Sequence, residues 1–204
     1  MNLFEKLLQL KELRFGDGEI SLLDSRVVLV QTDLFAEYGL RINNSPEKTF
    51  EFYDSIKTGF KGIVIKIMGR NYSFVFNDFF KWLTDVANMA GWGKVKWEML
   101  DVEKRTGVLV VEGSPIAVAL KGKVKYPVDD MIRGFIAGGA SASLKTDIDA
   151  VELDCSALGA PLCRFLFKPF DEFDFSKPEV IRQLGAKKNQ EPNKQTDFDV
   201  SAIK

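Results

Sequence analysis

Histidine is absent from this chain of 204 residues, and cysteine occurs only twice. Without histidine the chain cannot form Ser-His or Cys-His catalytic pairs, a histidine general base or an imidazole metal site. Two cysteines are also too few to hold an iron-sulfur cluster by thiolates. In a reducing compartment such a pair is more often free or metal-bound than joined in a disulfide. Several common enzyme designs are therefore excluded.

The sequence also lacks an excess of charge of either sign and any long apolar run. It has 28 basic and 29 acidic residues, so it shows no electrostatic footprint for nucleic acid. No stretch reaches the roughly 18 uncharged apolar residues that suggest a membrane span. The first residues mix charges into their apolar positions, unlike a secretory signal. We expect no nucleic-acid partner, no membrane span and a cytoplasmic location.

The length suits one domain with a substantial core. After Gly185 the composition shifts to Lys, Asn and Gln with a single aromatic residue, so little is left to bury. We predict one domain over residues 1–185 and a flexible C-terminal tail over residues 186–204. A binding role for the tail is the alternative.

The first part of the chain predicts short strands and two helices. Residues 20–31 are rich in β-branched and aliphatic residues and indicate one or two strands around a turn. Residues 32–39 indicate a short helix ended by glycine. Ser45 before Pro46 marks the start of a long helix, with a break near Gly62 as the alternative. Its predicted inward stripe is Phe52, Ile56, Phe60, Ile63 and Ile67.

The middle of the chain predicts a helix followed by a hairpin. Residues 77–91 read as a helix capped by Asn77 or Asp78 and ended by glycine. Residues 94–113 alternate apolar and polar positions around a turn, which indicates a β-hairpin. The segment 114–120 is either another strand or a short helix.

The last third predicts a helix and two strands. The helix begins at Asp129 or Asp130 and continues to Leu144, and its small residues permit close approach of a neighbouring backbone or a ligand. Two strand-like runs, DAVELDC and RFLFKPF, follow it. Residues 170–175 alternate phenylalanine and acidic residues, which indicates an edge strand or a docking segment, with a partner-binding site as the alternative.

The most informative stretch is residues 152–163, ELDCSALGAPLC. On an ideal strand Glu152 and Cys155 face opposite sides, so a bulge or turn at Asp154 must bring them together. The glycine-containing loop that follows can return Cys163 towards them. Two thiolates and a carboxylate are suited to Zn²⁺. Two core cysteines beside a surface glutamate are the alternative interpretation.

The stretch from Asp129 to Phe167 resembles the 4-vinyl reductase domain. The resemblance is carried by the helix segment GFIAGGASAS and by VELDCSALGAPLCRFLF, whereas the upstream part matches only in its order of helices and hairpin. The family occurs in phenol- and xylene-responsive activators, in bacteriochlorophyll-pathway proteins and in stand-alone archaeal proteins. The resemblance implies an α+β fold in which an antiparallel sheet packs with helices around an apolar pocket, as in vesicle-tethering TRAPP subunits and haem-based nitric-oxide sensors. It also implies a homodimer and a small hydrophobic ligand.

The resemblance further implies a metal site. In the aromatic-sensing relatives a zinc ion is held by cysteine, glutamate, cysteine and cysteine, and the last three match Glu152, Cys155 and Cys163. The first position falls on Asp129, which departs from the pattern because a carboxylate replaces a thiolate. An N-cap role is the alternative for Asp129. Four protein ligands leave no open position for water, so we expect a structural zinc rather than a catalytic one.

Aromatic side chains supply the candidate ligand pocket. Its predicted lining is Phe52, Ile56, Phe60, Phe79, Phe80, Trp82, Trp97 and Phe135, with Trp92 in the same inventory. Any one of these is more often plain core. Without histidine, a polar anchor for phenol has to come from another residue type, so we expect a more hydrophobic ligand.

These features favour a binding or sensing module over an enzyme. One alternative is a scaffold or assembly subunit that uses the same fold without a ligand. A reductase acting on a vinyl group of a tetrapyrrole is less favoured, because the sequence has no dinucleotide or phosphate-binding motif. A filled core would favour the scaffold, and an apolar cavity would favour the sensor.

Overall fold

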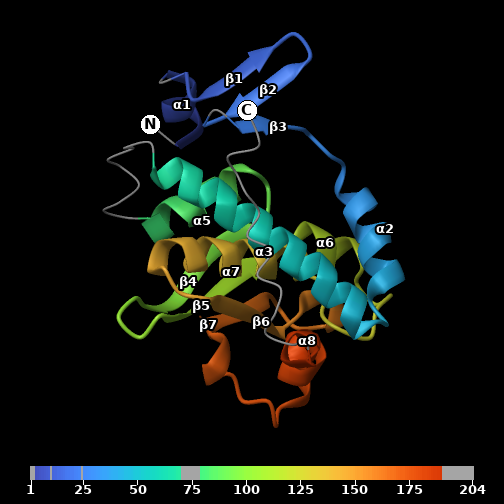
Figure 1. Ribbon diagram of the computed structural model, residues 1–204. Helices are drawn as coiled ribbons and strands as arrows, with labels where there is room; N and C mark the ends of the chain where they lie inside the picture. The colour runs from blue at the N-terminus through green and yellow to red at the C-terminus, as the bar shows by residue number, and fades with distance from the viewer. Residues whose placement is uncertain (1–2, 10, 24, 70–78, 190–204) are drawn as a thin grey trace.

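The computed structural model describes residues 3–9, 11–23, 25–69 and 79–189. Helices pack on two antiparallel sheets, which confirms the predicted α+β class (Figure 1). The larger sheet has the order β4-β5-β7-β6, and the smaller has the order β1-β2-β3. The large-sheet strands are β4 (Lys94–Asp101), β5 (Thr106–Glu112), β6 (Ile148–Asp154) and β7 (Cys163–Pro169). The helices are α1 (Leu3–Gln9), α2 (Thr32–Ile42), α3 (Pro46–Met68), α5 (Phe79–Met89), α6 (Pro115–Ala119), α7 (Asp130–Leu144) and α8 (Pro178–Asn189).

Helix α3 begins where the sequence predicts, directly after Ser45, and it is one continuous helix. The Ser45 hydroxyl accepts the N–H of Lys48, which satisfies one of the free donors of the first turn. The helix continues to Met68 without a break at Gly62. The predicted stripe is partly wrong, because Ile63 is 42 % exposed. Its buried side chains include Tyr53, Lys57, Val64 and Ile67. Tyr53 and Lys57 are buried because each bonds to Asp149 inside the protein, and a search for apolar positions does not detect such residues.

Helix α7 lies between α3 and the larger sheet, and most of its residues are buried. Its glycines permit the close contact with α3. A Cβ on Gly138 would lie 2.4 Å from the carbonyl oxygen of Lys57, and a Cβ on Gly134 would lie 2.7 Å from the Cβ of Ile56. The small residues of this helix therefore serve the approach of a neighbouring backbone.

The free edge of β6 is covered by side chains from three helices. Alternate residues of this strand direct their N–H and C=O groups away from β7. Ser141 bonds both groups of Ile148. The Tyr53 hydroxyl accepts the N–H of Ala150, and Arg133 donates to the Ala150 carbonyl. Gln183 bonds both groups of Glu152. Every outward backbone group at these three positions is thus satisfied within the chain.

A network of charges, buried at Lys57 and Asp149 and exposed at Asp147, joins α3, β6 and α8. The Lys57 ammonium lies 2.6 Å from a carboxylate oxygen of Asp147 and 2.9 Å from one of Asp149. Lys187 reaches the same two aspartates at 2.5 and 2.7 Å. The Tyr53 hydroxyl donates to Asp149 at 2.6 Å. We call these five residues the lysine cluster.

The N-terminal part forms a separate layer. Strands β2 (Glu19–Leu22) and β3 (Ser25–Val27) confirm the two-strand alternative, whereas α1 and β1 (Leu13–Gly16) were not predicted. This layer shares a small second core with α3, α5 and α7, formed by Leu7, Leu23, Val64, Ile67, Phe79, Trp82 and Ala142.

Most of the remaining sequence predictions agree with the structure. The hairpin β4–β5 and the strands β6 and β7 are present, and segment 114–120 contains the short helix α6. Helix α2 continues past Gly39 to Ile42. The caps Asn77 and Asp78 lie outside the described residues. The segment 170–175 begins with a 3-10 turn (Phe170–Glu172) and contains no edge strand, whereas Phe173 is buried against the domain, as the docking interpretation requires.

Helix α8 includes residues 186–189 of the predicted tail. The remainder of that segment lies outside the described residues, so the tail stays a prediction there.

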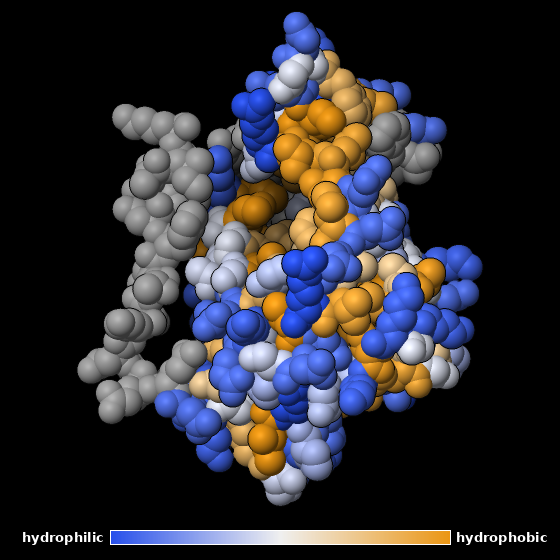
Figure 2. Space-filling view, turned by 90° about the vertical axis from the view of Figure 1, so that its right-hand side faces the viewer, coloured by the Kyte–Doolittle hydropathy of each residue, from blue (hydrophilic) through white to orange (hydrophobic). Residues whose placement is uncertain are grey.

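None of the described helices is long and apolar enough to cross a membrane. Apolar residues are nevertheless exposed on the connection between β3 and α2 and on α2 itself. Val28 and Leu29 are 75 % and 85 % exposed, and Leu34 is exposed in the first turn of α2. Figure 2 views the side that carries α2, and its hydrophobic surface is most extensive in the upper part. We call residues 28–34 the apolar connection.

Candidate functional site

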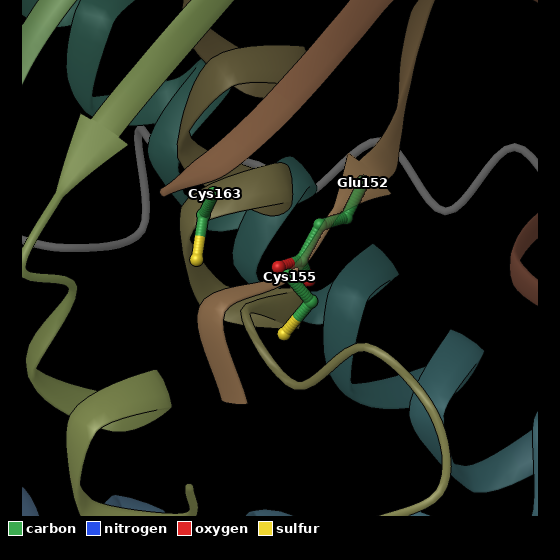
Figure 3. Close-up of side chains that lie close together, drawn as sticks. All are labelled: Glu152, Cys155 and Cys163. Carbon is green, nitrogen blue, oxygen red and sulfur yellow. The ribbon is translucent and has the colours of Figure 1, made fainter. Parts of the chain in front are cut away.

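Glu152, Cys155 and Cys163 converge at one end of the larger sheet. Their donor atoms all lie within 4.8 Å of one another, and all three side chains are buried. The register of β6 on β7 shifts between Glu152 and Asp154, which is the irregularity that two donors from one strand require. Figure 3 shows the carboxylate of Glu152 directed between the two cysteines.

The loop between β6 and β7 returns the chain to the same point. A single 3-10 turn (Ser156–Leu158) ends at Gly159, whose φ of 102° lies in the left-handed region that glycine adopts readily. Both the backbone N–H and the hydroxyl of Ser156 lie 3.3 Å from the sulfur of Cys163. The glycine and the serine thereby place Cys163, the first residue of β7, beside Cys155.

Asp129 lies beside this group, at the N-cap position of α7. It is fully buried, and its side chain makes no capping hydrogen bond. Its backbone N–H donates to Glu152 Oε2 at 3.1 Å, and the Ser114 hydroxyl donates to its Oδ1 at 2.7 Å. Its carboxylate also interacts with the thiol of Cys163. Asp129 therefore borders the three donors but is not one of the group within 4.8 Å.

Asp129, Glu152, Cys155 and Cys163 form a group that we call the thiol cluster. Each of its four side chains ionises to an anion. Burial and the neighbouring charge of Asp129 raise the pKa of Glu152 well above its ordinary value. Burial raises the pKa of Asp129 to about 6. The Cys155 thiol and burial raise the pKa of the Cys163 thiol. In this environment protons, or a cation in their place, are needed to offset the negative charge.

Two atoms of the thiol cluster indicate that the residues fit a metal ion. Glu152 Oε1 and Asp129 Oδ2 are buried and have no hydrogen-bond partner among the described residues. Buried polar atoms are rarely left in this state, and a bound ion is one of the standard reasons. Two sulfurs and carboxylate oxygens form a donor set suited to Zn²⁺. The cluster can therefore hold a divalent metal ion.

A second feature of the domain is an apolar cavity of about 120 Å³. It lies between α5, the β4–β5 hairpin, α7 and the middle of α3. Its lining is Phe60, Phe80, Leu83, Thr84, Val86, Ala87, Ala90, Trp92, Val95, Trp97, Leu109, Ile132, Phe135 and Ile136. Three of these side chains carry N–H or O–H groups: Thr84, Trp92 and Trp97. Thr84 donates to the Lys81 carbonyl and Trp97 to the Phe80 carbonyl, which leaves the indole N–H of Trp92 as the remaining side-chain donor of the lining.

Four of the eight predicted pocket residues line this cavity: Phe60, Phe80, Trp97 and Phe135. The other four lie elsewhere. Phe79 and Trp82 belong to the second core, because they point to the opposite side of α5. Phe52 stacks edge-on against Tyr38, and Ile56 packs against Gly134.

The small and aliphatic part of the lining was not predicted from the sequence. Ala87 and Ala90 on α5 leave space where larger residues would fill it, and Ile132 and Ile136 form the wall on α7. Their helical spacing marked an inward face, but this signal does not distinguish a packed core from a cavity wall.

Comparison with known proteins finds no family model that matches the sequence, and no curated protein matches it. Solved structures do match. The crystal structure of the phenol-responsive sensory domain of the transcription activator PoxR with phenol has a TM-score of 0.65 and 18 % identity, covering 90 % of this chain and 98 % of that one.

Two other structures have lower scores. A vinyl-4-reductase family protein from Methanocaldococcus jannaschii has a TM-score of 0.44 and 15 % identity, covering 70 % of this chain and 83 % of that one. A trafficking protein particle complex subunit 3 from Naegleria fowleri, covalently bound to palmitic acid, has a TM-score of 0.46 and 10 % identity, covering 67 % and 93 %. The match to the sensory domain extends over nearly the whole of both chains. This chain therefore shares the fold of the PoxR phenol-responsive sensory domain.

Proposed function

We propose that this protein is a binding or sensing module for a small hydrophobic molecule, most specifically a single-ring aromatic hydrocarbon. The observation that carries the proposal is the apolar cavity with aromatic walls. An apolar cavity of about 150 Å³ binds benzene, so a cavity of about 120 Å³ is close to the size of one ring. The shared fold with a phenol-responsive domain supports the same assignment.

The cavity favours a hydrocarbon over a phenol. Thr84 and Trp97 each donate to a backbone carbonyl, so the indole N–H of Trp92 is the one side-chain donor of the lining that is not committed to such a bond among the described residues. A phenol hydroxyl would lose several hydrogen bonds to water on entry and could gain the Trp92 N–H as its one side-chain donor, so the exchange costs binding energy. The presence of an apolar cavity also speaks against the scaffold without a ligand.

Ligand binding can be tested by calorimetry and by ligand-observed NMR with toluene and phenol. We expect toluene to bind more tightly than phenol. Ala87→Phe, which adds a ring to the cavity wall, should abolish binding, whereas Ile63→Phe on the exposed side of α3 should retain it. Failure of the wild-type protein to bind either compound would refute the hydrocarbon assignment.

We further propose that the thiol cluster holds a structural Zn²⁺ through Glu152, Cys155 and Cys163, with Asp129 as the fourth candidate. When bound, the ion supplies the positive charge that this buried group lacks and ties the ends of β6 and β7 to the start of α7. Native mass spectrometry with metal analysis should find one zinc per chain in the wild type and none in Cys155→Ser. The matched control is Asp154→Asn, which changes a half-exposed carboxylate in the same stretch and should keep the metal.

A second copy of this chain is the partner we propose, in a cytoplasmic location. The support for a homodimer is the apolar connection, because contiguous exposed apolar residues favour burial in an interface. Native mass spectrometry of the wild type should show a dimer. Val28→Glu together with Leu29→Lys should shift it to a monomer, and a monomeric wild type would contradict this assignment.

A further inference from the structure

The side chain of Gln183, on α8, forms two hydrogen bonds with the backbone of Glu152, one of the candidate metal ligands. Its Oε1 accepts the N–H of Glu152 at 2.9 Å, and its Nε2 donates to the Glu152 carbonyl at 2.9 Å. The side chain is 95 % buried, with 5 % relative exposure, so water does not readily replace these bonds. Gln183 thereby fixes the peptide groups on both sides of the Glu152 Cα.

Arg133 connects the same helix to the start of α7. Its Nε donates to the carbonyl of Ala150 on β6, and one of its terminal nitrogens donates to the carbonyl of Gln183 at 3.1 Å. Its other terminal nitrogen pairs with Asp130 at 2.5 Å, next to Asp129 in the chain. Helix α8 is therefore bonded to the two elements that supply the carboxylates of the thiol cluster.

These contacts reach the thiol cluster only through the backbone. The hydrogen bonds of Gln183 end on Glu152 N and O, while the Glu152 side chain projects between the cysteines (Figure 3). Metal sites depend strongly on residues that orient their ligands in this way, and loss of one typically weakens metal binding about 10- to 100-fold. The direction of a carboxylate at a bulge is especially dependent on such support.

We infer that Gln183 is a positioning residue for the Glu152 carboxylate, and that docking of α8 and loading of the thiol cluster are coupled. This inference rests on the proposed metal site. Because coupling between two equilibria is reciprocal, a bound metal must stabilise the docked helix by the same factor by which the docked helix tightens the metal.

Lys187 provides the matched control on the same helix. It anchors α8 to Asp147 and Asp149 of the lysine cluster and makes no hydrogen bond or ion pair with Glu152. Removing Lys187 thus deletes its ion pairs, while the bonds of Gln183 and Arg133 still hold α8 in its docked position and keep the support of the metal ligand. Gln183→Glu is an intermediate variant, since a carboxylate can accept the Glu152 N–H but cannot donate to its carbonyl.

The test is a Co²⁺ titration of the full chain, followed by thiolate-to-metal absorption, with Zn²⁺ competition. We expect Gln183→Ala to weaken affinity about 10-fold or more and to alter the spectrum of the loaded site. Gln183→Glu should lie between it and the wild type, and Lys187→Ala should stay within about two-fold of the wild type.

Hydrogen exchange of the α8 amides with and without Zn²⁺ measures the reverse direction. Zinc should slow exchange in the wild type and in Lys187→Ala, and the slowing should disappear in Gln183→Ala. Equal affinity losses in Gln183→Ala and Lys187→Ala, or unchanged affinity in Gln183→Ala, would overturn the inference while leaving the metal site intact. A wild type that binds neither Co²⁺ nor Zn²⁺ would overturn the metal site and the coupling together.

Discussion

Strand β6 carries one buried carboxylate of each of two polar clusters, which differ in how their charge is balanced. Asp149 belongs to the lysine cluster, and Glu152 belongs to the thiol cluster. Both carboxylates have no solvent exposure. Burial alone would raise the pKa of Asp149, yet the ammonium groups of Lys57 and Lys187 hold it below its ordinary value. Burial and the charge of Asp129 instead raise the pKa of Glu152.

The difference shows which cluster balances its charge with residues of this chain alone. In the lysine cluster two ammonium groups face two aspartates, and the Tyr53 hydroxyl donates to one of them. In the thiol cluster no lysine or arginine is paired with Glu152, and two carboxylate oxygens lack partners among the described residues. A buried anion without a counterion is costly, so the second cluster must either retain its protons or take up a cation from outside.

Removing a cation from the lysine cluster should have the largest effect. Lys57→Met leaves the buried Asp149 with only Lys187, and breaking a buried ion pair costs about 3–5 kcal/mol. Urea unfolding of the metal-free protein measures the loss. Arg41→Met, which breaks an exposed pair on α2, should cost less than about 1 kcal/mol. Similar losses in both variants would contradict the central role of this cluster.

Supplying a cation to the thiol cluster should have an effect of comparable size and opposite sign. At a free concentration about a thousand times its Kd, Zn²⁺ should raise the free energy of unfolding by about 4 kcal/mol. Cys163→Ser should abolish this increase, whereas Lys57→Met should lower stability but keep the increase. Thermal unfolding with and without Zn²⁺ distinguishes the two clusters. Stabilisation of Cys163→Ser by zinc would place the ion elsewhere.

Removing one neutral donor from the lysine cluster should cost less. Tyr53→Phe removes the hydroxyl that donates to Asp149 and accepts the N–H of Ala150. A buried group left without a partner costs about 1–3 kcal/mol. Chemical denaturation measures this against Tyr38→Phe, whose ring is half-exposed on α2. An unchanged free energy of unfolding in Tyr53→Phe would mean that other groups replace the hydroxyl.

The smallest expected effect is that of pH. Acid should weaken the lysine cluster, whereas little should change near neutral pH. Because the folded-state pKa of Asp149 is lowered, its stabilising contribution is present above its unfolded pKa of about 4 and is lost as pH falls through the folded value. The pKa of Lys187 is raised, although burial opposes this, so its contribution persists below about pH 10. We therefore expect the difference in the free energy of unfolding between wild type and Lys187→Ala to stay constant from about pH 5 to about pH 8. Below about pH 4 this difference should become smaller. A difference that grows in acid would contradict this assignment.

The sequence predicted those features that depend on local signals. Ser45 with Pro46 located the start of α3, and the alternation around a turn located the β4–β5 hairpin. The group Glu152, Cys155 and Cys163 was found because its residues are close in sequence and resemble a known family. In each case the residues that determine the feature lie within one short stretch of the chain.

The features that were missed depend on residues distant in sequence. Lys57 pairs with Asp149 across 92 positions, and a search for apolar periodicity passes over a lysine on a helix. The cavity depends on the absence of volume at Ala87 and Ala90 opposite α7, which only the packed arrangement reveals. The partner of Glu152 on α8 was also hidden, because an isolated glutamine has no sequence signature.

The covered edge of β6 limits how this protein can associate. A strand from another chain could pair there only by displacing Ser141, Tyr53, Arg133 and Gln183 together. At the opposite border of the sheet, the Asn88 amide bonds both the N–H and the carbonyl of Val95. The β6 edge is consequently protected against the addition of further strands, the route by which open β-structures polymerise, and the β4 edge is blocked at Val95.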